Sequence, residues 1–359
     1  MSAARSELSA AALREEIIRL GPWHFEIQIT PEISTRVAAE AEDVTYPEAF
    51  GKVRMRNPRE GFQRRLRRIY PDGLAGRSVL DCGCNCGAYL FYAKELGAGP
   101  GLGFDARRHW IDQARFIARH MPERSEDVRF EVADLYELPG LAPGEFDVTF
   151  FLGLFYHLPE PVTGLKLAAE RTRELLILNT ATRAGLPDGQ LVADYESPDL
   201  ADAGLHGLCW FPTGPAVLGR ILGWLGFAEV RCSVWRRAPN QRRGLDRVEV
   251  LAARSPGYFD AWDSGRPPGA AGLAEAIETG TPPGATVLVV GDRDDLPPLR
   301  DRTAIPLAAD RGALGRLQTS GAGYLAVPAS ARERLGEAQV SLGAQVNADR
   351  DCAIYALAT

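Results

Sequence analysis

The sequence lacks any apolar run long enough to cross a bilayer, although 45% of its 359 residues are hydrophobic. A membrane-spanning helix needs about 20 consecutive, mostly apolar residues. The start of the chain, Met1-Ser2-Ala3-Ala4-Arg5, also lacks the hydrophobic core of a secretory signal. We therefore expect a cytoplasmic protein without membrane contact, and this length favours about two domains.

The six cysteines lack the pairing typical of a zinc site or a disulfide framework. Cys82, Cys84 and Cys86 alternate within one short segment, whereas zinc sites commonly use C-x-x-C pairs. Small side chains packed at a crowded turn explain these three residues better than a metal does. We expect no metal site, and free thiols suit a reducing cytoplasm.

The chain also lacks an excess of positive charge. Its formal net charge is −6 and its pI is about 5.6, whereas dedicated nucleic-acid binders are more often basic. One segment differs, because it contains Lys52, Arg54, Arg56, Arg59, Arg64, Arg65, Arg67 and Arg68. This segment can contact an anionic substrate or RNA phosphates. The alternative is a solvated helix face, which the scarcity of aromatic residues for base stacking favours.

The most informative stretch is 78–87, where an apolar strand runs into a glycine-containing turn before a predicted helix. A phosphate-binding loop would place Lys and then Ser or Thr after its last glycine, but Ala88 and Tyr89 follow Gly87. The spacing also differs from the G-x-G-x-x-G dinucleotide fingerprint. Asn85 stands where a further glycine would fit, and Asn tolerates the left-handed region. The turn is therefore a candidate site for a nucleotide-type cofactor other than a phosphate-loop ligand.

Acidic residues follow the next predicted strands in order. Asp105 ends a strand at 102–105, Asp134 follows a strand at 129–133, and a fourth strand ends at Gly153. Asp105 lies about 20 residues after the turn, where an acid can bind ribose hydroxyls. Alternating strands and helices predict a parallel sheet with ligands at the carboxyl ends of its strands. Taken singly, each acid can equally cap a helix or end a strand.

Together these motifs resemble those of class I S-adenosylmethionine-dependent methyltransferases, over roughly residues 60–253. The resemblance implies an α/β fold with a Rossmann-like sheet and helices on both faces. It implies that Gly83 and Gly87 pass under the methionine part of the cofactor, that Asp105 holds the ribose and that Asp134 faces the adenine amino group. The residues expected at the cofactor are Asp81, Gly83, Cys84, Asn85, Gly87, Asp105, Ala106, Asp134, Leu135, Leu152 and Gly153.

Three segments also resemble the tRNA wobble-uridine carboxymethyltransferase family. They are Gly21-Pro22-Trp23, Gly153-Leu154-Phe155-Tyr156-His157-Leu158-Pro159-Glu160-Pro161 and Leu208-Cys209-Trp210-Phe211-Pro212-Thr213. Members of that family use a carboxylated S-adenosylmethionine. A lysine near the upstream tryptophan, a tyrosine and an arginine hold its extra carboxylate.

The match to that carboxylate site is incomplete. Tyr156 corresponds to the tyrosine, and Arg242 is the candidate arginine. The lysine is missing, because His24 and Phe25 follow Trp23. Ordinary S-adenosylmethionine is therefore the expected cofactor, and its carboxylated form is the alternative.

Alkyl transfer requires an aligned acceptor and, for a hydroxyl, removal of a proton. His157 lies on the loop that faces the transferable methyl in this fold, and the ordinary histidine pKa of about 6.5 suits a general base. His157 can equally only shape the loop. His24 and His206 are alternative bases, and Tyr156 can orient the sulfonium or the acceptor. Candidate substrate-binding residues are Trp23, His206, Trp210, Phe211 and Arg242, of which the aromatic ones can equally belong to the core.

We expect three parts along the chain. Residues 1–76 form an N-terminal helical lid and substrate-lining segment, whose amphipathic helix over 7–20 can cover the cofactor or simply pack on the sheet. Residues 77–254 form the cofactor-binding domain, and the polar, Gly- and Pro-rich stretch 180–208 predicts an insertion over its active face. Residues 270–359 form a small accessory α/β domain without a catalytic centre, which can serve in a homodimer.

These patterns predict a methyltransferase that acts at an oxygen of a small polar metabolite, of saccharide or natural-product type. The alternative function is methylation or carboxymethylation of a tRNA wobble uridine. A third hypothesis, from a different class, is a non-catalytic binding protein that keeps the cofactor fold as a scaffold.

Overall fold

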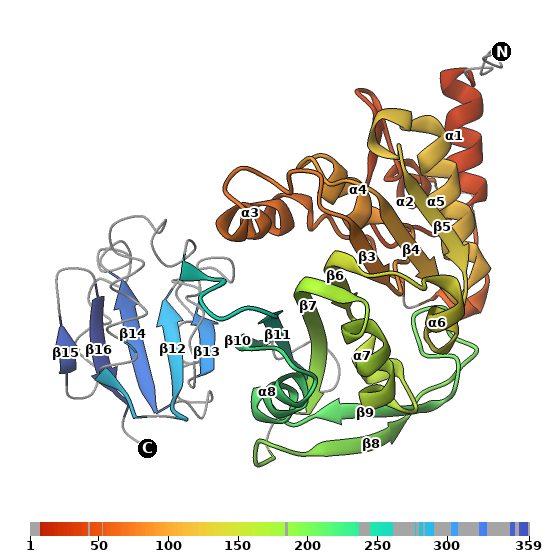
Figure 1. Cartoon of the computed structure of the whole chain (residues 1–359). Coiled ribbons are helices and arrows are strands. Elements are labelled where there is room, and N and C mark those ends of the chain that lie inside the picture. The colour runs from red at the N-terminus through yellow and green to blue at the C-terminus, as the bar shows by residue number, and fades with distance from the viewer. Residues whose placement is uncertain are drawn as a thin grey trace.

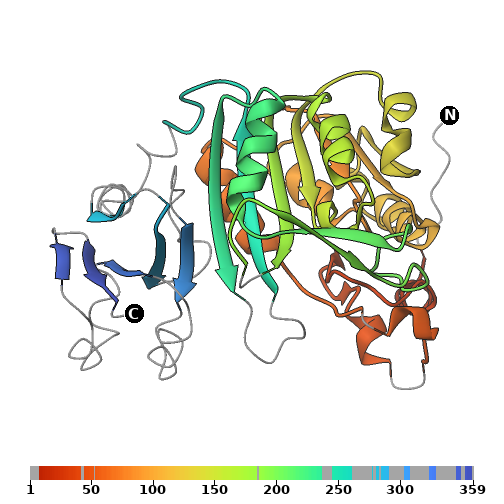
Figure 2. The same cartoon turned by 90° about the horizontal axis from the view of Figure 1, so that it is seen from below.

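Two β-sheets organise the chain, as Figures 1 and 2 show. Among the residues that this computed structural model describes, the first sheet has seven strands in the order β10-β11-β7-β6-β3-β4-β5 and the second has five in the order β13-β12-β14-β16-β15. The described residues are 8–41, 44–51, 53–183, 186–236, 245–260, 277, 280–282, 284–290, 303–307, 323–328, 345–348 and 352–357.

The seven-stranded sheet is parallel except at one edge. The pairs β3–β4, β4–β5, β3–β6 and β6–β7 are parallel, whereas β11 pairs antiparallel with both β7 and β10. The chain leaves β3 toward β4 on one side and later returns to place β6 on the other, which creates a topological switch point beside β3. The strands are β3 (Val79–Cys82), β4 (Gly101–Asp105), β5 (Val128–Val132), β6 (Phe146–Leu152), β7 (Thr172–Arg183), β10 (Glu229–Arg236) and β11 (Leu245–Ala253).

Helices cover both faces of this sheet, as the resemblance implied. Alternate strand residues divide between the two cores: Val79 and Phe150 belong to the cluster that contains α3, α4 and α5, and Leu80 and Phe151 belong to the cluster that contains α6, α7 and α8. This alternation follows from the period-2 geometry of a strand. The helices are α1 (Ala10–Arg19), α2 (Val37–Glu40), α3 (Arg59–Ile69), α4 (Ala88–Lys94), α5 (Arg108–His120), α6 (Leu138–Leu141), α7 (Pro161–Ala169) and α8 (Pro215–Trp224).

The amphipathic N-terminal helix α1 packs beside α5. Its apolar residues Leu13 and Ile17 are buried in the core that contains α5. Gln113 of α5 donates to the carbonyl oxygens of Leu20 and Pro22 at 2.7 and 2.9 Å, which ties the end of α1 to the sheet domain. Of the two alternatives for this helix, the described contacts match packing on the domain.

The predicted insertion contains a two-stranded hairpin. Strand β7 runs on to Arg183, and β8 (Leu191–Tyr195) then pairs antiparallel with β9 (Leu208–Pro212). A second small ribbon, β1 (Gln28–Thr30) with β2 (Ile33–Ser34), lies in the N-terminal segment. The residues between β8 and β9 return to the carboxyl ends of the parallel strands, where the candidate site lies.

The second sheet has the strands β12 (Thr286–Val290), β13 (Thr303–Leu307), β14 (Tyr324–Pro328), β15 (Gln345–Ala348) and β16 (Cys352–Ala356). The sequences of β12, β14 and β16 are apolar runs typical of strands, whereas those of β13 and β15 are less distinctive. Pro306 obscures β13, because proline is tolerated mainly on edge strands, and β13 is an edge strand. Leu288 and Leu325 share a hydrophobic cluster with Leu222 of α8, so this sheet packs against the first domain.

Among the residues that the structure describes, no helix is long and apolar enough to span a membrane.

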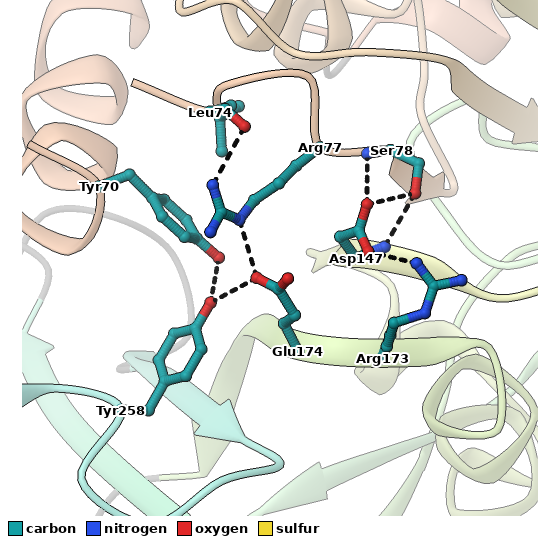
Figure 3. A network of polar contacts seen from close by, with 8 residues as sticks. All are labelled: Tyr70, Leu74, Arg77, Ser78, Asp147, Arg173, Glu174 and Tyr258. Carbon is teal, nitrogen blue, oxygen red and sulfur yellow. Dashed lines mark hydrogen bonds and ion pairs between the residues drawn. The ribbon is translucent and has the colours of Figure 1, made fainter. Parts of the chain in front are cut away.

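A polar network joins the amino-terminal ends of the central strands (Figure 3). The hydroxyl oxygens of Tyr70 and Tyr258 are 2.6 Å apart, and Tyr258 donates to Glu174 Oε2 at 3.0 Å. Arg77 Nε donates to the same carboxylate oxygen at 2.8 Å, and its guanidinium lies 4.7 Å from the centre of the Tyr70 ring. These contacts join the segments before β3 and after β11 to the start of β7.

A second part of this network joins β3 to β6. Asp147 accepts hydrogen bonds from the backbone and hydroxyl of Ser78, both at 2.8 Å, and from Arg173 at 2.5 Å. Because the carboxylate is hydrogen-bonded in its charged form, the pKa of Asp147 stays below its usual value despite partial burial, which acts to raise it.

Replacing Tyr258 by Phe should lower the free energy of unfolding by about 1–2 kcal/mol, because the variant leaves the Tyr70 hydroxyl without its partner and removes a donor to Glu174. Urea unfolding measures the change. The matched control is Tyr195→Phe, because Tyr195 is 78% exposed. The control should change stability by less than about 0.5 kcal/mol. A Tyr258→Phe effect as small as the control would contradict the role of this network.

Candidate active site

The turn after β3 has the left-handed conformations that its sequence indicated. Gly83, Asn85 and Gly87 have φ angles of 68°, 51° and 78°. Asn85 supports its own conformation, because its side-chain oxygen accepts from the Cys86 backbone at 2.8 Å. A Cβ at Gly87 would lie 2.5 Å from the Phe130 ring, so the close approach of the backbone also requires glycine.

Asp105, at the end of β4, fixes this turn. Its Oδ2 accepts a hydrogen bond from the backbone N–H of Asn85 at 3.0 Å, and its Oδ1 accepts one from the backbone N–H of Arg107 at 2.9 Å. Burial raises the pKa of Asp105 to about 6, although the two backbone donors act to lower it. A carboxylate oxygen can accept more than one hydrogen bond, so Asp105 keeps capacity for ligand hydroxyls.

Asp81, at the carboxyl end of β3, is the second acid of the site. Its side chain is 1% exposed, and its Oδ2 has no hydrogen-bond partner among the described residues. Burial and the nearby Asp105 raise the pKa of Asp81 to about 8. A buried polar atom without a partner is costly. A ligand that brings donors would satisfy it, and both ribose hydroxyls and the ammonium of a methionine group are such donors.

Asp134 follows β5 and has a structural role. Its side chain accepts from the Tyr136 amide at 3.0 Å and forms a capping box with Glu137. The other carboxylate oxygen lies 3.1 Å from Nε2 of His206. His206 therefore lies beside Asp134, the acid that we expect near the adenine. Of the apolar residues expected at the cofactor, Leu135 is buried and Leu152 is half-buried.

The cysteines of the turn are packing residues. Cys82, Cys84 and Cys86 are all at most 2% exposed. Burial raises the pKa of Cys86 to about 12 and that of Cys82 and Cys84 well above the usual range, so the three thiols stay protonated at neutral pH. Among the described residues, no group of three or more His, Cys, Asp or Glu side chains is arranged to hold a metal ion.

Arg247 of β11 reaches the loop that follows β6. Its Nη1 donates to Asn179 Oδ1 at 3.1 Å, and its Nη2 donates to the Tyr156 hydroxyl at 3.4 Å. Its guanidinium lies 5.2 Å from the centre of the Tyr156 ring, and a Cβ at Gly153 would lie 3.9 Å from Nη1. Arg242, the arginine that the sequence predicted for this region, lies outside the described part of the chain. The sequence offered one sign of this residue, because Arg247 is a charged residue within the largely apolar strand β11.

A second arginine, Arg56, reaches the surroundings of Tyr156 from the N-terminal segment. The backbone of Arg56 forms an isolated β-bridge with Phe25, in which the Arg56 N–H donates to the His24 carbonyl at 3.2 Å and the Arg56 carbonyl accepts from the Glu26 N–H at 2.9 Å. The Arg56 guanidinium lies 5.0 Å from the centre of the Phe25 ring. It acts electrostatically on both His24 and Tyr156.

The two arginines set the protonation states around them. Burial, Arg56 and Arg247 together lower the pKa of His24 to about 3, so His24 is neutral at physiological pH and is a weak base there. Burial opposes ionisation of Tyr156, but His157, Arg247 and Arg56 outweigh it and lower the pKa of Tyr156 to about 8. This end of the site therefore favours negative charge.

His157 lies in the short 3-10 helix Phe155–His157 after β6. Its Nδ1 is 2.8 and 2.9 Å from the two carboxylate oxygens of Glu196, a residue that sequence analysis did not single out. Burial acts to lower the pKa of His157, but Tyr156 and Glu196 outweigh it and raise that pKa above its ordinary value. The Tyr156 and His157 ring centroids are 3.9 Å apart.

The three aromatic candidates have different surroundings. Trp23 is 2% exposed in the core, and its indole donates to the Ile17 carbonyl at 2.8 Å. Trp210 donates to the Pro159 carbonyl at 2.9 Å, which joins β9 to the loop that carries His157. Phe211 stacks on Tyr156, with ring centroids 5.6 Å apart. The structure thus brings Phe211 to the site and places Trp23 in the core.

Several arginines of the basic segment make contacts within the chain. Arg59 pairs with Glu95 at 2.7 Å, and Arg65 pairs with Glu249. Arg54 donates to two backbone carbonyls, those of Gly51 and Val53. Three residues of the basic segment therefore have partners within the chain.

Comparison with known proteins gives a family for the central part of the chain. Residues 79–174 match a family model described as a methyltransferase domain. The strand order, the glycine turn and the ordered acids agree with that match. The chain contains a class I S-adenosylmethionine-dependent methyltransferase domain.

Among curated proteins, the methyltransferase domain is similar to tRNA U34 carboxymethyltransferases. That of Ectopseudomonas mendocina is 33% identical over 202 residues, which cover 54% of this chain and 58% of that protein. That of Hydrogenovibrio crunogenus is 32% identical over 200 residues, which cover 53% of each chain. The similarity thus spans a little over half the length of these relatives.

Among solved structures, the N-terminal domain of EvdMO1 with SAH bound has a TM-score of 0.51 to this chain. The two chains are 19% identical, and the similarity covers 70% of this chain and 99% of that one. This likeness concerns the fold.

Replacing Asp105 by Asn should weaken binding of S-adenosylmethionine about 10- to 100-fold, because a hydrogen bond to a charged group contributes about 1.5–3 kcal/mol. Isothermal titration calorimetry measures the affinity. Asp112→Asn, an exposed position on α5, is the matched control and should bind as the wild type does. Equal affinities for all three proteins would contradict the role of Asp105, and absence of binding to the wild type would contradict the cofactor.

Proposed function

We propose that this chain transfers a carboxymethyl group from carboxylated S-adenosylmethionine to a nucleophilic atom of a tRNA wobble uridine. The observation that carries the proposal is the contact of Arg247 with Tyr156 beside Gly153. A tyrosine and an arginine are two of the three groups that the resemblance expects around the extra carboxylate. The relatives named as tRNA U34 carboxymethyltransferases support the same assignment.

The third expected group, a lysine after Trp23, has a spatial counterpart. His24 is neutral and cannot supply the positive charge. The backbone of Arg56 forms a bridge with Phe25, the residue after His24. The charge of Arg56 acts on Tyr156. A cation is thus retained near the tyrosine, although it comes from another segment of the chain.

The residues of the site fit a sulfonium cofactor, which supplies an already activated alkyl group when bound. Asp105 would accept hydrogen bonds from the ribose hydroxyls, and the unpartnered Asp81 oxygen would accept from the ammonium. Arg247 and Tyr156 would bind the carboxylate of the transferred group. His157 would take the proton from the acceptor at Nε2, because Glu196 already occupies its Nδ1.

A second candidate function is methyl transfer from ordinary S-adenosylmethionine to an oxygen of a small polar metabolite. Two observations favour it. The expected lysine is absent from the sequence, and arginines of the basic segment pair with Glu95 and Glu249 within the chain. In that case Arg56 and Arg247 would hold an anionic acceptor instead of an anionic cofactor.

Mass spectrometry of the ligand that remains on the purified protein separates the two functions, because the carboxylated cofactor is heavier by one carboxyl group. We expect the heavier form. Label transferred from it to U34 of tRNA would support the whole proposal. Retention of ordinary S-adenosylmethionine together with methyl transfer to a metabolite would overturn it in favour of the second candidate.

Replacing Arg247 by Met should weaken carboxylated S-adenosylmethionine about 10- to 100-fold and the ordinary form less than about threefold, because only the former has a carboxylate to pair with the guanidinium. Calorimetric titrations with both compounds measure this. Arg129→Met, an exposed arginine of β5, is the control. Equal losses for both compounds would contradict the carboxylate site.

A further inference from the structure

The segment between β8 and β9, residues 196–207, crosses the site; we call it the strap. Arg107, two residues after Asp105, holds it through one nitrogen: Nη2 donates to the carbonyl oxygens of Pro198, Leu200 and Ala203 at 2.9, 2.8 and 3.0 Å. At its far end, His206 reaches Asp134. The strap therefore contacts residues that follow both β4 and β5.

The near end of the strap carries Glu196. Both oxygens of this carboxylate lie within 2.9 Å of His157 Nδ1, and Oε1 also accepts from the Gly204 amide at 2.8 Å. The side chains of His157 and Glu196 are only 16% and 14% exposed. Any Cβ at Gly204 would collide with the His157 carbonyl oxygen, so the strap packs directly on the histidine.

We propose that Glu196 is a positioning residue that fixes the tautomer of His157 and stabilises its protonated form during transfer. The proposal rests on the function above, in which His157 receives the acceptor proton. With Nδ1–H donating to the carboxylate, Nε2 is the free proton acceptor. The acceptor proton moves to Nε2, the acceptor's electron pair forms the new bond to carbon, and the carbon–sulfur bond breaks with its electrons remaining on sulfur.

The other charged groups around His157 do not duplicate this role. Tyr156 is on the same short helix and favours the imidazolium, Arg247 approaches from β11 and opposes it, and Asp105 interacts with His157 from the end of β4. Among these interactions, Glu196 makes the hydrogen bond to Nδ1. A carboxylate on Nδ1 orients the imidazole ring and also increases the basicity of the ring. Removing the charge of Glu196 should therefore loosen the orientation of His157 and, separately, lower its basicity.

The test is a histidine NMR titration of the full chain, which needs no substrate. The sequence has five histidines, so the His157 signal can be assigned by its loss in His157→Gln. In wild type the midpoint should lie above the ordinary value of about 6.5. In Glu196→Gln it should move to lower pH by about one unit or more, because an opposite charge at this distance no longer favours the imidazolium.

Two further variants and a transfer assay sharpen the result. Asp199→Asn makes the same chemical change at an exposed position in the strap and should leave the midpoint unchanged. Glu196→Asp keeps the charge and should retain a raised midpoint. In transfer assays, the rise of kcat/KM with pH should shift to lower pH in Glu196→Gln by the same interval as the NMR midpoint.

An unchanged His157 midpoint in Glu196→Gln would overturn the positioning role. If that variant fails to fold, a wild-type midpoint at or below about 6.5 would overturn it as well. A shifted midpoint in a protein that transfers no group would retain the positioning of His157 and refute the proposed function.

Discussion

Two backbone amides that converge on the Asp105 carboxylate hold the site together. The Asn85 amide brings the turn after β3 to the end of β4, and the Arg107 amide fixes the start of the next helix. The same Arg107 then binds the strap through its side chain, and the strap carries the Glu196 that contacts His157. One buried carboxylate thus connects the cofactor turn, through a short series of hydrogen bonds, to the residue proposed to accept the proton.

The site is electrically polarised along its length. Asp81 and Asp105 crowd the ends of β3 and β4, where burial raises the pKa of each. Arg56 and Arg247 act at the other end of the site. Burial and these two arginines lower the pKa of His24, and both arginines help to lower that of Tyr156. A ligand that is rich in hydroxyl and ammonium donors at one end and anionic at the other complements this arrangement. This polarity favours His157 over His24 as the proposed base, because burial and two guanidinium groups lower the pKa of His24, whereas Glu196 helps to raise that of His157.

The parts of the site that the sequence predicted are those set by local backbone geometry. The sequence predicted the turn at 83–87, the acid that ends β4 and the parallel pairing of the central strands. Glycines, a strand-ending acid and alternating strands and helices can each be recognised within a short stretch of sequence. Arg247 and Glu196 were missed for the opposite reason, and Arg56 was named only as one member of a basic segment. Each reaches the site from a different segment, through sheet pairing, a backbone bridge or a loop, so no local pattern places it there. The substrate-binding role of Trp23 stays a prediction: its motif is local, and its indole donates to a carbonyl of α1 inside the core.

The missing lysine illustrates how electrostatics differs from motif matching. A site that binds a carboxylate needs a positive charge at a certain place in space, not at a certain place in the sequence. A long arginine side chain can bring that charge from a neighbouring segment. His24 stands after Trp23 where a lysine was expected, yet the backbone of Arg56 is hydrogen-bonded to that same segment. Arg56 also differs from a lysine chemically, because its planar guanidinium can pair with a carboxylate through two parallel hydrogen bonds and can lie over the Phe25 ring. On the proposed function, the departure from the motif therefore changes which residue binds the carboxylate without removing the means to bind it.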